Sequence, residues 1–376
     1  MTTPDPVLTK AKKRLMPNIK KKLAWIGLGL GALALRYALA GHPEIIERYY
    51  SRMLFPVLRW LIDYLLAWLP LPLIYLFLIG LAYLVVRGVA RWWRGAFQHP
   101  WQKAVAGVLG IGAFLSGGIF LFLFLWGFNY GRLPIEEQLG LGLEPLSFSE
   151  LKEEFAHETE VIKRLRKEIP GANRNPISEE MLPENLEKKL RAELESWLAQ
   201  HGFSTVGRVR GRYVLPKGIF LRFSSSGLYF PFTGEGHIDA GLHALQKPYV
   251  MAHELAHGYG FGDEGTCNFL GYLACIQSED PLIAYTGHLN YWRTLAADYL
   301  QYEPEKYREF RESLPLGIQS DLDAINEVLL RYPDILPRFR YYAYDAYLKS
   351  QGIHEGMKNY DRVTMLVRAW RMSQRI

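Results

Sequence analysis

The 376-residue sequence has only two cysteines, which excludes a fold held together by several disulfide bonds. It has no fixed internal period, which excludes a repeat or collagen-like protein. Acidic residues are scarce early in the chain, because residues 23–131 contain only Glu44, Glu47 and Asp63. An apolar content of 49% excludes a disordered chain. The uneven placement of charge predicts two unlike parts, a membrane region and a C-terminal globular domain.

Two long stretches of the first part contain no charged residue. They cover residues 64–86 and 104–131, and each exceeds the ~20 residues that cross a hydrocarbon core. A further apolar run, residues 23–41, contains Arg36 near its C-terminal end, from where a long side chain can reach the interface. These runs predict three membrane-spanning helices. The tripeptide at residues 38–40 resembles a signal-peptidase site, so cleavage of the first run is an alternative.

Basic residues indicate which side of the membrane is cytoplasmic. Residues 1–22 carry seven lysines and arginines against one acid, and residues 87–103 carry four against none. By the positive-inside rule, both segments are expected in the cytoplasm. Residues 132–376 then form an extracytoplasmic domain on a multi-pass protein of the cytoplasmic (inner) membrane. The amphipathic piece at residues 44–68 is expected to lie partly in the outer interface.

The expected partners follow from the same distribution of charge. The formal net charge is +6, but no nucleic-acid-binding motif accompanies the basic N-terminal tail, residues 1–22. No nucleic-acid partner is therefore expected. The lipid bilayer, and a peptide or protein substrate near the membrane, are the expected partners.

Residues 132–376 have the pattern of helices around a small sheet. Ser147 and Glu150 have the spacing of a capping box at the start of one amphipathic helix, and a second helix is expected over residues 178–200. Short β-prone pieces between glycines predict strands at residues 204–209, 213–215, 219–223 and 228–232. The pattern is helical again from residue 247. The predicted class is an α+β, helix-dominated domain with a small sheet.

The most informative motif is HExxH, written here as His253-Glu254-Leu255-Ala256-His257. Residues four apart project from one face of a helix, so the two histidines can share one Zn²⁺ at about 2.0–2.1 Å. Glu254 is rotated by about 100° from His253 and can address a water at the metal rather than the metal itself. The alternative, a buried helix whose histidines merely bond their neighbours, is costly without a metal.

Two acids downstream are candidates for the third zinc ligand. The count HExxHxxGxxD nominates Asp263, as in metzincin-like enzymes that use an aspartate. The string Asp263-Glu264-Gly265 resembles instead the segment from which thermolysin-like gluzincins supply a glutamate, although the spacing from His257 is shorter here. We favour Glu264 and keep Asp263 as the alternative. Asn268, four residues further on, is expected to orient a ligand imidazole.

Other residues are candidates for roles around the metal. An oxyanion donor should be a Tyr, His or Arg held over the zinc, and a structural role is the alternative for each candidate. The candidates are His288, Tyr360 and Arg362.

A strand just upstream of the metal helix is the candidate substrate-binding element. Zincins place there the edge strand that pairs with an extended peptide, and an internal strand is the alternative. The residues concerned are Leu228, Tyr229 and Phe230. Cys267 and Cys275 lie about 12 Å apart along one helix, too far to bond to each other, so buried thiols are expected.

The whole chain resembles a bacterial family of uncharacterised membrane proteins with a zincin-like domain. The resemblance rests on three N-terminal spans, WGFNYGR at residues 126–132, YFPFTGE at 229–235, HELAHGYGFGDEGTCNF at 253–269, and residues 352–362. It implies a zinc peptidase fold of the gluzincin type. We therefore expect a membrane-anchored zinc metallopeptidase acting outside the cytoplasmic membrane. The alternatives are a catalytically idle zincin fold that serves as a binding or assembly module, and a protease-type sensor.

Overall fold

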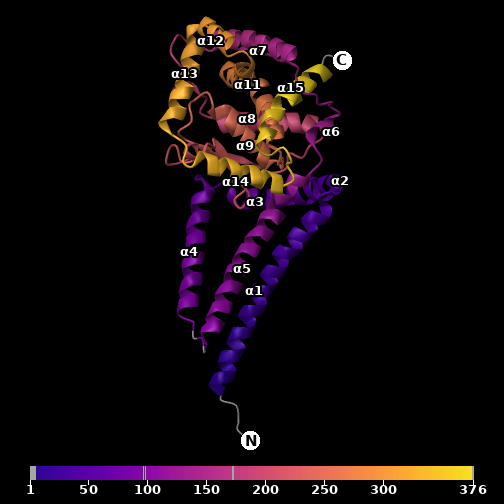
Figure 1. Ribbon diagram of the computed structural model, residues 1–376, viewed down its shortest axis with the longest axis vertical. Helices are drawn as coiled ribbons and strands as arrows, with labels where there is room; N and C mark the ends of the chain where they lie inside the picture. Colours follow the sequence, from indigo (N-terminus) through magenta and orange to yellow (C-terminus); the bar gives the residue numbers. More distant parts are fainter. Residues whose placement is uncertain (1–5, 96, 98, 172, 375–376) are drawn as a thin grey trace. The chain divides into compact units, whose positions relative to one another are not determined.

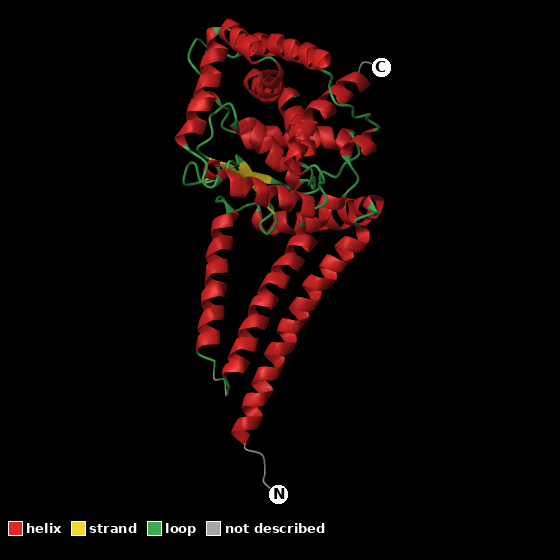
Figure 2. Cartoon of the chain, viewed as in Figure 1, coloured by secondary structure: helices red, strands yellow, loops and turns green. Residues whose placement is uncertain are grey.

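The computed structural model describes residues 6–95, 97, 99–171 and 173–374, with side chains from residue 19 onward. Helices dominate, and one small sheet accompanies them (Figures 1 and 2). The chain divides into two compact units. The first contains residues 1–43, 73–128 and 231–233, and the second contains residues 44–72, 129–230 and 234–376.

Three long helices make up most of the first unit. They are α1 (Pro6–Leu39), α4 (Leu73–Trp93) and α5 (Pro100–Leu125). Within the described residues, the stretches Ile19–Leu39, Leu73–Trp93 and Pro100–Leu125 are long and apolar enough to cross a membrane. Small residues bring α1 and α5 close together, since a Cβ atom on Gly29 would meet the backbone of Ser116. Three apolar helices, as expected, indicate a membrane protein.

The bounds of the spans differ from the predicted ones. The second span begins at Leu73 rather than at residue 64, because Pro70 and Pro72 interrupt the apolar run. Residues 64–66 belong instead to α3 (Phe55–Leu66). The third span ends at Leu125 rather than at residue 131, and Gly127–Gly131 forms a short 3₁₀ helix. The first span ends at Leu39, two residues earlier than predicted.

The second unit contains the remaining helices. Its first stretch of chain, residues 44–72, comprises the end of α2 (Pro43–Ile45), a π-helical stretch (Ile46–Leu54) and α3. The helices that follow it are α6 (Ile135–Leu139), α7 (Phe148–Glu168), α8 (Leu186–Gln200), α9 (Lys247–Gly258), α10 (Glu264–Ile276), α11 (Pro281–Tyr302), α12 (Pro304–Ser313), α13 (Leu316–Arg331), α14 (Pro337–Ser350) and α15 (Arg362–Ser373). The predicted capping box is present at the start of α7.

The sheet has three strands, β1 (Arg210–Val214), β2 (Gly227–Phe230) and β3 (Glu235–Asp239), in the order β1-β3-β2. β3 is parallel to β1 and antiparallel to β2, which lies at an edge. The sheet differs from the predicted one because residues 218–221 wrap around a carboxylate. Asp239 accepts hydrogen bonds from the backbone N–H groups of Gly218, Phe220 and Leu221. These donors are therefore not available to a ladder, and the expected strand at 219–223 is replaced by a turn that leads into a short 3₁₀ helix, Leu221–Phe223.

The core of the second unit surrounds α9 and α10. Nearly every residue of these two helices is buried, and α9 lies against all three strands of the sheet. Gly271 of α10 lies against the backbone of α9, where a Cβ atom would come within 3.2 Å of the backbone nitrogen of His253. This close approach brings the side chains of the two helices together along their contact.

Candidate metal centre

Three buried side chains converge between α9 and α10. His253 Nε2 lies 3.1 Å from His257 Nε2, and Glu264 Oε2 lies 3.2 Å and 3.4 Å from these two nitrogens. A tetrahedral ion with ligands at about 2.0–2.1 Å separates its ligand atoms by about 3.3–3.4 Å. The three atoms therefore have the spacing of three corners of a zinc tetrahedron, and the fourth corner would be available to water or substrate.

The outer nitrogens of the two histidines define their tautomers. His253 Nδ1 donates to Asn268 Oδ1 at 2.9 Å, and His257 Nδ1 donates to the Phe261 carbonyl oxygen at 2.8 Å. With a proton on Nδ1, each ring can present a lone pair from Nε2 to a cation at the centre. Two lone pairs and a carboxylate oxygen then face one another, an arrangement that a bound cation stabilises. The residues fit Zn²⁺, which takes imidazole and carboxylate ligands.

A glycine-rich turn brings the third side chain back to the first two. α9 ends at Gly258, and Gly260 has a φ of 87°, a left-handed conformation that favours glycine. Asp263 then caps α10, because its Oδ1 accepts from the Thr266 N–H at 2.7 Å. The cap fixes the start of the helix and places Glu264 in its first turn.

The two acids that the sequence left open have different surroundings. Asp263 Oδ2 accepts from Asn359 Nδ2 and from the Arg362 guanidinium, both at 2.7 Å. Both of its oxygens are thus engaged in holding the start of α10. Glu264 is the acid that lies against His253 and His257.

Glu254 lies beside this cluster in a space formed by two glycines. A Cβ atom on Gly227 or on Gly236 would come within 2.5 Å of the Glu254 side chain. Its Oε2 is buried and has no hydrogen-bond partner among the described residues. Burial raises the pKa of Glu254, while the two neighbouring histidines lower it. A buried carboxylate with an unsatisfied oxygen at this position can accept a proton from a water at the centre.

Two tyrosine hydroxyls lie near the other carboxylate oxygen of Glu264, Oε1. The Tyr344 hydroxyl donates to Glu264 Oε1 at 2.9 Å, and the Tyr360 hydroxyl lies 3.4 Å from that of Tyr344. Burial raises the pKa of both tyrosines well above the ordinary value, so both remain hydrogen-bond donors at neutral pH. Tyr360 was a sequence candidate. Tyr344 was not, because α14 carries several tyrosines and no local pattern distinguishes this one.

The other two oxyanion candidates lie in ion-pair clusters. His288 Nδ1 pairs with Glu158 Oε2 at 2.8 Å. Arg362 bridges Asp263 and Glu136. These contacts correspond to the structural alternative that the sequence left open for each.

The candidate substrate strand coincides with β2 at the edge of the sheet. The Tyr229 ring centre lies 6.3 Å from that of His257. Cys267 and Cys275 are free and buried, as expected. The Cys267 sulfur lies 3.3 Å from His257 Nδ1, a contact that the sequence did not predict.

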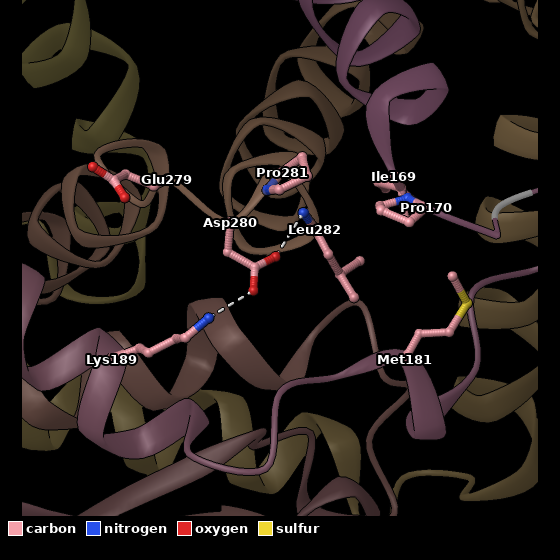
Figure 3. A pocket seen from close by; sticks show the side chains of 8 residues that line it. All are labelled: Ile169, Pro170, Met181, Lys189, Glu279, Asp280, Pro281 and Leu282. Carbon is pink, nitrogen blue, oxygen red and sulfur yellow. Dashed lines mark hydrogen bonds and ion pairs between the residues drawn. The ribbon is translucent and has the colours of Figure 1, made fainter.

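A separate hollow of about 460 Å³ lies at the N-terminal end of α11 (Figure 3). Lys189 Nζ pairs there with Asp280 Oδ2 at 2.9 Å, and Asp280 caps α11 through the Leu282 N–H. Neither histidine nor cysteine lines it, so it lacks the ligand set found between α9 and α10. Its lining residues are Ile169, Pro170, Met181, Lys189, Glu279, Asp280, Pro281 and Leu282.

Comparisons with curated proteins and with solved structures gave no match. A family model described as a protein of unknown function (DUF3810) matches residues 50–368. The matched range includes two of the three apolar helices, the sheet, the HELAH helix and both tyrosines beside Glu264. The chain therefore belongs to the DUF3810 family.

Proposed function

We propose that the protein is a membrane-anchored, zinc-dependent peptidase with a zincin-like second unit of the gluzincin type. The observation that carries this proposal is the approach of His253 Nε2, His257 Nε2 and Glu264 Oε2 to within 3.1–3.4 Å of one another. Their spacing and chemistry suit one Zn²⁺. When bound, Zn²⁺ would supply a Lewis acid that polarises a carbonyl group and makes water a stronger nucleophile.

The remaining side chains have roles that follow from their positions. Glu254 would accept a proton from the attacking water and return it to the leaving amine as the peptide C–N bond breaks. Tyr360, held beside Tyr344, is a candidate donor to the negative charge that develops on the carbonyl oxygen. Asn268 holds His253 in the ligating tautomer.

β2 would pair with an extended peptide substrate. The Asp239 N–H donates to the Ser226 carbonyl oxygen. Because hydrogen-bonded pairs alternate along an antiparallel ladder, the backbone groups of Gly227 and Tyr229 point away from β3. They point to the outer edge of the sheet, the side on which zincins pair an extended peptide.

Purified full-length protein is expected to contain one Zn²⁺ and to hydrolyse members of a broad peptide library. Chelation should abolish hydrolysis, and added zinc should restore it, because the site supplies only three protein ligands and a replaceable fourth position. Metal content and cleavage products can be measured on the same sample by mass spectrometry. Zinc without hydrolysis would favour the idle binding module, and no zinc would overturn the proposal.

Variants of the acids and histidines test the ligand set. Glu264→Ala and His257→Ala should lower zinc affinity by more than the roughly 10–100-fold expected for an outer partner such as Asn268. Asp263→Ala should lower it least, because this carboxylate caps α10. Competition with a chromophoric chelator measures each affinity. Equal retention of zinc by Glu264→Ala and Asp263→Ala would contradict the assignment.

We further propose that the protein lies in the bacterial cytoplasmic membrane, with the second unit outside. The basic segments before the first span and between the second and third spans support this orientation. A periplasm-active phosphatase fused after Ile376 should be active, and one fused after Trp93 should be inactive. The reverse pattern of activities would contradict the topology.

A further inference from the structure

The linking segment, residues 43–68, has two faces of opposite character. One face is buried in the second unit, and its residues follow one another every four positions, or after five positions across the π-helical stretch. The extra residue of the π turn keeps both Tyr50 and Phe55 on this face. Its members are Ile46, Tyr50, Phe55, Arg59, Asp63 and Ala67. The opposite face is exposed, at spacings of three and four, and consists of Tyr49, Met53, Val57, Trp60, Tyr64 and Trp68.

An ion pair on the buried face, between Arg59 and Asp63, holds the segment in the second unit. The Arg59 guanidinium pairs with Asp63, and it donates to the Gly234 carbonyl oxygen at 2.7 Å and to the Tyr229 hydroxyl at 3.2 Å. Asp63 also accepts from the Arg208 N–H. The segment is thereby fixed to the edge strand β2 and to the turn that precedes β3.

A second anchor leads to the glycine turn after the metal helix. Glu47 pairs with Arg132 at 2.8 Å, and Arg132 donates to the Gly260 carbonyl oxygen at 2.8 Å. Gly260 lies between His257 and Glu264 in the chain. The linking segment is therefore connected to both elements that position the candidate site, to β2 through Arg59 and to the turn through Glu47 and Arg132.

The exposed face is apolar over a long distance. Between Met53 and Trp68, every exposed residue is apolar or aromatic, and Trp60 stacks on Tyr64 at 5.4 Å. A continuous surface of this kind is unfavourable in water. Both ends of the segment lead into apolar helices, since α1 ends at Leu39 and α4 begins at Leu73. Both ends therefore emerge at the same membrane surface.

We infer that the exposed face of the linking segment binds the phospholipid surface and holds the second unit there. Tryptophan and tyrosine are the residues enriched at the level of the lipid headgroups. The apolar side chains enter the boundary between headgroups and acyl chains, while Glu47 and Arg59 fix the segment to the turn and to β2. Substrate would then be taken up at the lipid surface. The lipid contact itself rests on exposure and connectivity and does not depend on the metal.

The test uses full-length protein in nanodiscs and a small fluorophore at a single introduced cysteine. Val57→Cys reports on the linking segment, and Leu316→Cys in α13 is the matched control, because the two residues are 54% and 52% exposed. Cys267 and Cys275 are completely buried and should not react. Phosphatidylcholine brominated near the headgroup should quench the fluorophore at residue 57 at least about twofold, as expected for a side chain ~5–10 Å into the interface. The control should stay unquenched.

Met53→Cys provides a second reporter on the same face, for the case that Val57→Cys does not fold. Equal quenching at residues 57 and 316, or at 53 and 316, would overturn the inference. Cross-linking of two chains through residue 57, without quenching by lipid, would show that a second copy covers this face. Because the readout is independent of zinc and hydrolysis, its failure would leave the proposed peptidase activity untouched.

Discussion

Glu254→Gln should keep the zinc and the fold while lowering peptide hydrolysis by at least ~10²-fold, the usual contribution of a positioned general base. The amide has nearly the same shape as the carboxylate and fits the space beside Gly227 and Gly236. It cannot accept the proton of the attacking water. Initial rates at saturating substrate, together with metal content, measure both parts of the expected result.

The same substitution at Glu264 is the matched control. Both carboxylates are buried, and each has one oxygen without a hydrogen-bond partner among the described residues. Glu264→Gln should lose metal affinity, whereas Glu254→Gln should not. Loss of zinc from Glu254→Gln would assign this residue a structural role. An unchanged rate in that variant would trace the hydrolysis to a contaminant.

Arg59→Met should destabilise the second unit by about 3–5 kcal/mol, the usual cost of leaving one partner of a buried ion pair unpaired. Asp63 would remain buried without its guanidinium, and the Gly234 carbonyl oxygen would lose its donor. At about 2–4 °C per kcal/mol for a unit of this size, the melting temperature should fall by ~6–20 °C. Thermal unfolding of the full-length protein in nanodiscs, followed by circular dichroism, measures the change.

An exposed ion pair provides the comparison for Arg59. Arg308 pairs with Glu305 on α12, and both side chains are largely exposed. Arg308→Met should cost no more than ~1 kcal/mol. Asp63→Leu added to Arg59→Met should recover part of the loss, because no unpaired charge then stays buried. A melting temperature of Arg59→Met equal to that of Arg308→Met would contradict the anchoring role.

The parts of the candidate site that could be predicted from the sequence are local in the chain. His253 and His257 follow from helical spacing, and the glycines after them predict the turn that returns Glu264 and Asn268. The choice between Asp263 and Glu264 needed the structure, because it depends on Asn359 and Arg362, which lie about a hundred residues further along the chain. The local sequence does not distinguish a capping acid from a ligand when the two are adjacent at the start of a helix.

The parts that could not be predicted depend on long-range contacts. Tyr344 reaches Glu264 from α14, one of several tyrosines with the same local pattern. The strand β3 contains a glycine and two acids, which are depleted in strands, with Ile238 as its one β-branched residue, and pairing on both sides stabilises it. The predicted start of the second span, residue 64, lies before the observed start at Leu73. Residues 64–69 carry no charge, so hydropathy alone assigns them to the span. The structure places residues 64–66 in α3, an amphipathic helix whose charged residues Arg59 and Asp63 are buried.

The ligands of the candidate centre all come from one short helix–turn–helix, residues 253–264. Closing so short a loop costs little chain entropy even in an unfolded polypeptide. The denatured chain should therefore retain affinity for Zn²⁺. Any affinity of the denatured chain subtracts from the stabilisation that a ligand gives to the native state. Zinc should consequently raise the melting temperature of this protein less than its native-state affinity alone implies.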